Sequence, residues 1–260
     1  MRSVVVQSYR TQSPSWLQAC MRSVKDWALQ QGHEYQFVDD RLFDYVPAQI
    51  MQTPPSTVLP LTDLARLGLL KDLLNSGYDR AIWVDADVLV FRPEYFRIPD
   101  LCGGMLCREV WTYEDENKQI RHRPGINNAV AAFDRGHPLL DFLHHAALEL
   151  FAHLRPEQIH SSRIGTDFYT LLGRIYPMRL LTQVACFSPI ITRALLSGEQ
   201  TYLLREYGDQ FGDPFHAVNL SRFKLVEDAA KEAPQVRDVM SEEQLLRLKF
   251  TTMKNFGTHS

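Results

Sequence analysis

The sequence predicts an α/β protein built around a mixed, mainly parallel sheet. The first observation is the order of its opening segments: an apolar run at residues 4–6, an amphipathic stretch over 16–31, and a second apolar run at 35–38. The second is an apolar strand pattern at 81–84, which follows a leucine-rich helical stretch over 61–76. A strand, a helix and a second strand in that order form a crossover between parallel strands, which predicts a doubly wound sheet.

The opening segments are justified residue by residue. Three valines form the first run, and polar residues follow them at once, as at the end of a buried strand. Leu17, Met21 and Val24 then recur at helical spacing, and Gly32 stands where a helix C-cap glycine is expected. The run at 35–38 is a second strand that ends in two aspartates.

The next segments continue the same alternation. Residues 44–60 contain four prolines and are predicted to form a loop. A strong helix is expected over 61–76, and Gly77 closes it. Residues 81–84 then form a buried strand, and 88–91 a second apolar run.

The remainder of the chain is less regular. Residues 138–154 are predicted to form a helix, and residues 242–250 a short one. No internal repeat, low-complexity tract or clear linker divides the sequence. We therefore expect one domain over residues 1–222, with a helical or irregular tail at 223–260 that packs on it.

The bulk composition excludes several classes of protein. The 260 residues are 45% hydrophobic and 23% charged, which suits a globular protein with a proper core. A net charge of −3 gives no basic surface for nucleic acid. The start does not look like a signal peptide, and no apolar run is long enough to span a bilayer. Four cysteines without a Cys-x-x-Cys pair indicate reduced thiols, so a soluble, cytoplasmic protein without a transmembrane segment is expected.

An acidic triplet, Asp85, Ala86 and Asp87, lies between two apolar runs. A buried charge is costly unless it is paired or coordinates a metal. The carboxyl ends of parallel strands form the ligand crevice of open α/β sheets, and two carboxylates there can bind Mn²⁺ or Mg²⁺. Such a cation neutralises a diphosphate and acts as a Lewis acid on a leaving nucleoside diphosphate. An ordinary solvated turn is the alternative.

Asp63 and Arg66 strengthen the case for this chemistry. They lie three residues apart and so share one face of the preceding helix. Together with the acidic triplet they resemble the retaining GT-A glycosyltransferases, which include large glucosylating toxins, glycogenin-like enzymes and bacterial capsule or lipopolysaccharide sugar transferases. The resemblance implies a GT-A (Rossmann-like nucleotide-sugar-binding) fold, Asp63 and Arg66 on the donor, and Asp85 and Asp87 on the ribose, the metal and the diphosphate. An exposed ion pair between Asp63 and Arg66 is the alternative.

Two later segments resemble the sugar pocket of the same family. Residues 125–130 resemble a segment that lines that pocket; Asn127 matches it, and Ala129 stands where glycine is more usual. Residues 165–168 resemble an acidic segment near the donor sugar and the acceptor, with Asp167 as its carboxylate. The resemblance thus assigns Asn127 and Asp167 to catalysis. A turn into a strand at Asn127, and a helix N-terminus that stabilises Asp167, are the alternatives.

The segment from His216 to Arg222 resembles the family's His-x-x-Gly-x-x-Lys motif. In that motif the histidine completes the metal site and the lysine meets the diphosphate. His216 matches the histidine, Asn219 replaces the glycine and Arg222 replaces the lysine. Arginine keeps the positive charge and can bind phosphate through two hydrogen bonds. An ordinary core or surface histidine is the alternative for His216.

The donor site is completed by residues near the ends of the strands. Gln7 and Tyr9 follow the first strand, whose loop faces the crevice, so Tyr9 can stack on a nucleobase. Ala86 lies between the two aspartates and is assigned to the donor with them. An ordinary loop aromatic is the alternative for Tyr9.

The sequence therefore predicts a metal-dependent hexosyltransferase that uses a nucleoside-diphosphate sugar and an acceptor hydroxyl. UDP as the nucleotide and retention of configuration are implied by the resemblance only. The sequence does not distinguish among a glycan, a lipid-linked glycan and a protein as the acceptor. It also allows a peripheral contact with a membrane. One rival is a haloacid-dehalogenase-type phosphotransferase with Asp85 as nucleophile, although Leu89 stands where that motif carries a hydroxyl. The other is a non-catalytic nucleotide-sugar-binding module.

Overall fold

The computed structural model of the chain describes residues 1–100, 103–232 and 240–257. Its strands are β1 (Ser3–Ser8), β2 (Glu34–Val38), β3 (Arg80–Val84), β4 (Val88–Val90), β5 (Gly104–Glu114), β6 (Ile120–Asp134), β7 (Arg179–Leu181), β8 (Val184–Cys186) and β9 (Ala217–Asn219). Its α-helices are α1 (Ser15–Gln30), α2 (Ala48–Gln52), α3 (Leu59–Asn75), α4 (Pro138–His153), α5 (Thr166–Leu172), α6 (Pro189–Ser197), α7 (Thr201–Phe211), α8 (Arg222–Glu232) and α9 (Glu242–Phe256). The 3₁₀ helices in these ranges are η1 (Asp40–Tyr45) and η2 (Pro156–Gln158).

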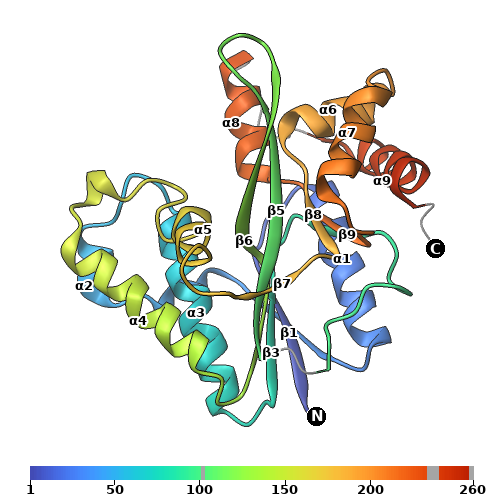
Figure 1. Cartoon of the computed structure of the whole chain (residues 1–260). Coiled ribbons are helices and arrows are strands. Elements are labelled where there is room, and N and C mark those ends of the chain that lie inside the picture. The colour runs from blue at the N-terminus through green and yellow to red at the C-terminus, as the bar shows by residue number, and fades with distance from the viewer. Residues whose placement is uncertain (101–102, 233–239, 258–260) are drawn as a thin grey trace.

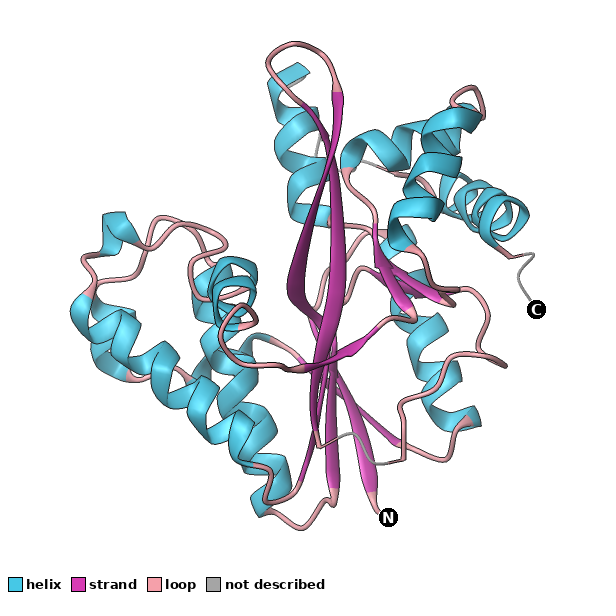
Figure 2. Ribbon diagram, viewed as in Figure 1, coloured by secondary structure: helices cyan, strands magenta, loops and turns pink. Residues whose placement is uncertain are grey.

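The strands form one large and one small sheet (Figure 2). The large sheet has the order β2-β1-β3-β6-β5-β7, and the small sheet the order β4-β9-β8. In the large sheet β1 is parallel to β2 and β3, β6 is antiparallel to β3 and β5, and β7 is parallel to β5. All its strands except β6 share one direction, so the predicted α/β class with a mixed, mainly parallel sheet is confirmed.

Helices cover both faces of the large sheet, with α2 to α5 on one side and α1, α6, α7 and α9 on the other (Figure 1). Alternating residues of the central strands supply both cores, because successive side chains of a strand point to opposite faces. On β3, Trp83 packs against the leucines of α3, whereas Ile82 and Val84 pack with Val24 and Trp27 of α1. A strand buried on both faces reads as a continuous apolar run, as predicted for 81–84.

Local signals explain where the main helices begin and end. Pro60 lies in the first turn of α3, where its missing N–H costs no helical hydrogen bond. Gly77 follows α3 with a φ of 114°, and Gly32 follows α1 with a φ of 77°; both values favour glycine. The predicted ends of these two helices are therefore confirmed to within two residues.

Two predictions and one alternative, the turn at Asn127, need correction. Residues 44–60 are not a simple loop, because they hold the end of η1 and the short helix α2, which Pro47 precedes. Asn127 does not lie in a turn, because β5 and β6 form one long hairpin and residue 127 is inside β6. The C-terminal helix is longer than predicted and runs to Phe256.

The C-terminal elements pack on the rest of the chain through an aromatic cluster. The ring of Phe256 in α9 lies 5.0 Å from Phe215 and 6.0 Å from Tyr207, measured between centroids. Leu245 and Leu248 of the same helix are buried in the same core. Helix α9 therefore packs against the core that contains the aromatic cluster. Within the described ranges, each helix is too short or too polar to cross a bilayer.

Candidate functional site

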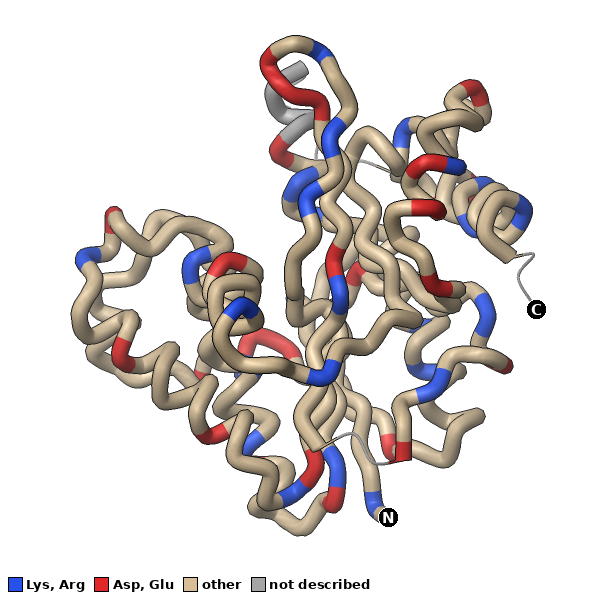
Figure 3. Tube along the Cα trace, in the orientation of Figure 1, with Lys and Arg blue, Asp and Glu red and all other residues tan. Residues whose placement is uncertain are grey.

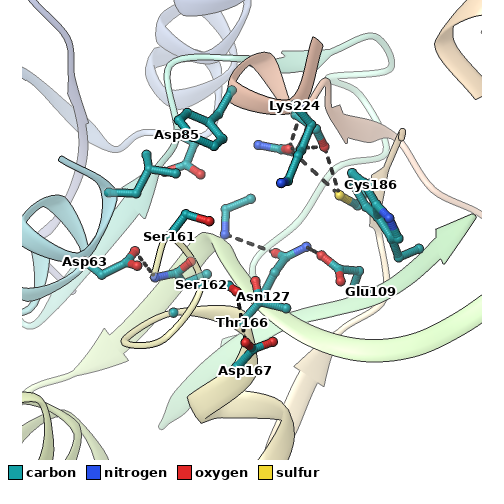
Figure 4. A pocket seen from close by; sticks show the side chains of 18 of the residues that line it. Asp63, Asp85, Glu109, Asn127, Ser161, Ser162, Thr166, Asp167, Cys186 and Lys224 are labelled. Atoms are coloured by element: carbon teal, nitrogen blue, oxygen red, sulfur yellow. Dashed lines mark hydrogen bonds between the residues drawn. The ribbon is translucent and has the colours of Figure 1, made fainter. Parts of the chain in front are cut away.

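A cavity of about 460 Å³ opens at the carboxyl end of β3. Its walls come from α3, the acidic triplet, the β5–β6 hairpin, the loop before α5 and the turn from β9 into α8 (Figure 4). Most of its lining side chains are polar or charged. Those used below are Asp63, Arg66, Asp85, Asp87, Glu109, Trp111, Asn127, Asn128, Gly165, Asp167, Asn219, Ser221 and Lys224.

Asp85 is held rigidly at the end of β3. Its backbone N–H donates to the carbonyl of Ala129 at 2.7 Å, and its carbonyl accepts from Gln7 Nε2 at 3.1 Å. Its Oδ1 accepts from Trp83 Nε1 at 2.7 Å and lies 3.1 Å from Arg66 Nη1. The backbone of Asp85 is thus held by β1 and β6, and its carboxylate by Trp83 of β3 and Arg66 of α3.

Asp87 is anchored by the turn that joins β9 to α8. Asn219 Nδ2 donates to its Oδ1 at 2.9 Å, and the backbone N–H of Arg222 donates to its Oδ2 at 2.7 Å. This turn is tight, because Ser221 adopts a φ of 51°. The antiparallel pairing of β4 with β9, with Val88 opposite Asn219, places the turn beside the acidic triplet.

Asp63 and Arg66 form a buried ion pair rather than an exposed one. Their side chains are 8% and 6% exposed, and Arg66 Nη2 lies 3.2 Å from Asp63 Oδ1. Asn128 joins them: its amide donates to Asp63 at 2.9 Å and its carbonyl accepts from Arg66 at 3.0 Å. A side chain at Gly165 would collide with Asp63, since a Cβ there would lie 2.6 Å from Oδ2. Glycine thus lets the loop before α5 close over the pair.

The cluster carries more negative than positive charge. Burial raises the pKa of Asp63 to about 6, against the opposing effect of Arg66. Burial raises the pKa of Asp87 to about 6 as well, and the neighbouring Asp85 carboxylate adds to the rise. Burial also raises the pKa of Asp85. Three carboxylates surround the single guanidinium of Arg66, so the cluster would be stabilised by a further positive charge.

A divalent cation fits this charge pattern only if a ligand completes its coordination. Across residues 1–100, 103–232 and 240–257, no group of three His, Cys, Asp or Glu side chains could hold a metal ion. Mg²⁺-type sites commonly use only one or two carboxylates together with substrate phosphates. Asp85 and Asp87 match that smaller set, because both are acidic oxygens on one wall of the cavity.

His216 stands apart from the acidic triplet. The β4–β9 register pairs Ala217 with Val90, so His216 lies at the far end of β9 from Asp87. Its carbonyl accepts from the backbone N–H groups of Phe91 and Arg92, and its ring lies 5.5 Å from that of Tyr95. The structure does not bring it into the cavity as the expected third metal ligand, and Asn219 lies beside Asp87 instead.

Asn127 and Asp167 both line the cavity. Asn127 Nδ2 donates to Glu109 Oε2 at 3.1 Å, and its Oδ1 accepts from the backbone N–H of Ala129 at 3.1 Å. Asp167, in the first turn of α5, accepts from Ser162 Oγ at 2.9 Å. The two side chains come from different walls and face a common space (Figure 4).

The other predicted donor residues lie behind or beside the cavity. Gln7 is buried and bonds the carbonyl of Asp85, so it supports the site from beneath. The guanidinium of Arg222 lies 5.5 Å from the ring centroid of Tyr9, which brings the two together outside the cavity lining. Ala86 is 8% exposed and packs into the core beside the triplet.

Several cavity residues were missed from the sequence, among them Glu109, Asn128 and Lys224. Glu109 is a buried acidic residue of β5, and burial raises its pKa. The charged pair Arg108 and Glu109 within the otherwise apolar run 105–111 is the signal that could have found it. Asn128 adjoins the predicted Asn127. Lys224 lies two residues beyond Arg222 and is the cation that reaches the cavity from α8.

Comparison with known proteins yields structural likeness only. No protein-family model matches the sequence, and no curated protein matches it significantly. A glycosyltransferase involved in the glycosylation of the major capsid of PBCV-1 aligns with 89% of this chain and 100% of its own, at 10% identity and a TM-score of 0.47. The galactosyltransferase LgtC, in complex with donor and acceptor sugar analogs, aligns over 95% of both chains, at 14% identity and a TM-score of 0.46.

A Drosophila β1,4-galactosyltransferase 7 mutant, in complex with manganese, UDP-Gal and xylobiose, aligns over 67% of this chain and 74% of its own. Its identity is 12% and its TM-score 0.31. At such identities and scores, the function of this chain has to be derived from its own residues.

Proposed function

We propose that this chain is a metal-dependent GT-A glycosyltransferase that moves a hexose from a nucleoside-diphosphate sugar to an acceptor hydroxyl. The observation that carries the proposal is the pair of carboxylates, Asp85 and Asp87, fixed at the end of β3 in a polar cavity. UDP as the nucleotide and retention of configuration belong to the same proposal and rest on the resemblance of the sequence motifs.

The donor would lie with its diphosphate over the acidic triplet. Asp85 and Asp87 would hold Mn²⁺ or Mg²⁺, which as a Lewis acid stabilises the charge of the leaving diphosphate. Lys224 already points into the cavity from α8 (Figure 4). Its ammonium now lies 2.7 Å from Glu227 Oε2, and it can turn from that exposed partner to a phosphate oxygen. Positive charge placed where negative charge grows favours the transition state over the ground state.

The nucleoside would lie toward β1. Tyr9 follows that strand and can stack on a flat base, and the guanidinium of Arg222 lies beside its ring. The ribose would then meet Asp85, whose position Gln7 and Trp83 fix.

The sugar would occupy the space between the hairpin and the loop before α5. Asp63, Arg66 and Asn128 form its floor, and their mutual hydrogen bonds hold them in one arrangement. Asp167 and Asn127 face the sugar from the side and can accept or donate hydrogen bonds to its hydroxyls. A fixed set of polar groups of this kind positions the anomeric carbon relative to the acceptor.

A thermal-shift screen of nucleoside diphosphates and nucleotide sugars, with and without manganese, tests the proposal. We expect the melting temperature to rise for one nucleotide, and only with the metal present. A response instead to magnesium with beryllofluoride, and to no nucleotide, would favour the phosphotransferase that uses Asp85 as nucleophile. Donor binding without turnover of any sugar would favour the non-catalytic module.

A further inference from the structure

A second hollow, here called the outer groove, adjoins the cavity along β5. Its volume is also about 460 Å³. Trp111 and Lys224 line both hollows, so these two side chains form the boundary between them. The far walls of the outer groove come from Ile190 and Arg193 of α6 and from Glu227 of α8. A molecule that lies in the cavity and is long enough to pass Trp111 therefore extends into the outer groove.

One face of β5 connects the two hollows. Glu109, Trp111 and Tyr113 alternate along the strand and so share a face. Thr112 bonds His122 on the other face, and it also lines the outer groove, which therefore takes side chains from both faces of β5. Exposure rises along this row: Glu109 is 6% exposed, Trp111 is partly exposed and Tyr113 is 41% exposed. The row thus runs from the cavity toward solvent, and its two outer residues, Trp111 and Tyr113, are aromatic.

The outer groove has the chemistry of a site for a neutral, hydroxyl-rich ligand. Trp111 and Tyr113 give it flat apolar surface, and its lining cations, Arg193 and Lys224, are matched in number by the carboxylates of Glu114 and Glu227. The hairpin tip beyond it is acidic, with Glu114, Asp115 and Glu116 together (Figure 3). A polyphosphate or nucleic acid would need a cluster of cations there and would be repelled by this tip.

We propose that the outer groove binds the acceptor, and that the acceptor is an oligosaccharide of at least two sugar units. This inference rests on the proposed glycosyltransferase function. Sugar rings present a face of C–H groups that buries apolar area against an aromatic ring, while their hydroxyls hydrogen-bond to charged side chains. Trp111 underlies the ring that carries the accepting hydroxyl, next to the cavity, and Tyr113 underlies the following ring.

Binding to an array of immobilised mono- to hexasaccharides, with UDP and manganese present, tests this assignment. The wild-type chain is expected to bind oligosaccharides and to bind the matching monosaccharide at least about tenfold more weakly, as loss of one stacked ring implies. Tyr113→Ala should lower binding of the longer ligands about tenfold, and Trp111→Ala should lower all of them. Tyr176→Ala removes a tyrosine of similar exposure, 45%, outside both hollows, and should change nothing.

The donor measurement separates the two levels of the proposal. The rise in melting temperature caused by UDP with manganese is recorded for each variant. If the wild-type chain shows no such rise, the proposed function itself is contradicted. If the wild-type chain binds UDP but binds no oligosaccharide on the array, the acceptor assignment is overturned. It is also overturned if Tyr113→Ala and Trp111→Ala bind the array as the wild-type chain does.

Discussion

Asp63 shows most clearly what burial does to a single residue of this site. Its carboxylate is 8% exposed, and it contacts Arg66 and Asn128 on its two sides. Arg66 is shared with Asp85, so the positive charge available to each carboxylate is incomplete. The raised pKa of Asp63, about 6, follows from burial that this shared partner does not offset.

The raised pKa makes a prediction about stability. A carboxyl that binds its proton more tightly in the folded chain adds stability below about pH 4, and that contribution is lost as the pH rises through about 6. Asp63→Asn removes this dependence. The comparison is the free energy of unfolding in urea of Asp63→Asn minus that of the wild-type chain. This difference should be larger at pH 7.5 than at pH 4.5, by on the order of 2 kcal/mol. An equal difference at both pH values would show that the charge of Asp63 does not destabilise the folded chain.

Individual residues of the site were predictable where a motif fixed their spacing. The acidic triplet and the pair of Asp63 with Arg66 were found because neighbours in sequence share one turn or one helix face. Glu109 and Lys224 were not found, because their place in the cavity depends on strand register and on the turn before α8.

At the scale of elements, the turn from β9 to α8 has the largest effect on the site. It brings Asn219 and the backbone of Arg222 to Asp87, and it does so through Ser221 with a φ of 51°. Left-handed backbone is costly for residues with a Cβ, so the conformation is held by the contacts around it.

This turn can be tested with two variants that both lack the serine hydroxyl. Ser221→Gly and Ser221→Ala lose the same hydrogen bond to Asn219 and differ only in the Cβ. We expect the glycine variant to be more stable than the alanine variant by about 1 kcal/mol, because glycine adopts positive φ freely. Thermal unfolding of the two proteins measures the difference. Equal melting temperatures would mean that the turn relaxes in both.

The elements themselves were predicted unevenly, for a physical reason. Buried strands such as β3 and amphipathic helices such as α3 carry a continuous or periodic apolar pattern. The β5–β6 hairpin does not, because its outer half leaves the core and carries charged residues on both strands (Figure 3). The position of His216 shows the same limit: its distance from Asp87 is set by the pairing of β4 with β9, which the sequence does not reveal.

At the scale of the whole molecule, the C-terminal region beyond residue 222 takes part in both core and site. Lys224 of α8 lines the cavity, and Leu248 of α9 is fully buried in the core that contains the aromatic cluster. Arg22 of α1 also pairs with Glu242 of α9 at 3.0 Å. We propose that this region is an integral part of the domain and that the boundary predicted at residue 222 marks no independent unit.

Two leucines on one helix test this proposal. Leu248→Ala should lower the free energy of unfolding of the whole chain by about 2–5 kcal/mol, the usual cost of emptying a buried leucine site. Leu246→Ala, at a position 62% exposed, should change it by less than about 0.5 kcal/mol. Chemical denaturation followed by tryptophan fluorescence measures both, since the tryptophans lie outside α9. A Leu248→Ala chain as stable as the wild type would show that α9 is dispensable for the fold.

The measurement that tests the central claim most directly is calorimetric titration of manganese into the chain, with and without UDP. We predict strong binding of a single ion only when UDP is present, because Asp85 and Asp87 alone are too few ligands. Asp87→Asn should abolish it, whereas Asp141→Asn, at a site 72% exposed on α4, should not. Manganese binding that is unaffected by UDP and by Asp87→Asn would contradict the metal-dependent donor site on which the proposed function rests.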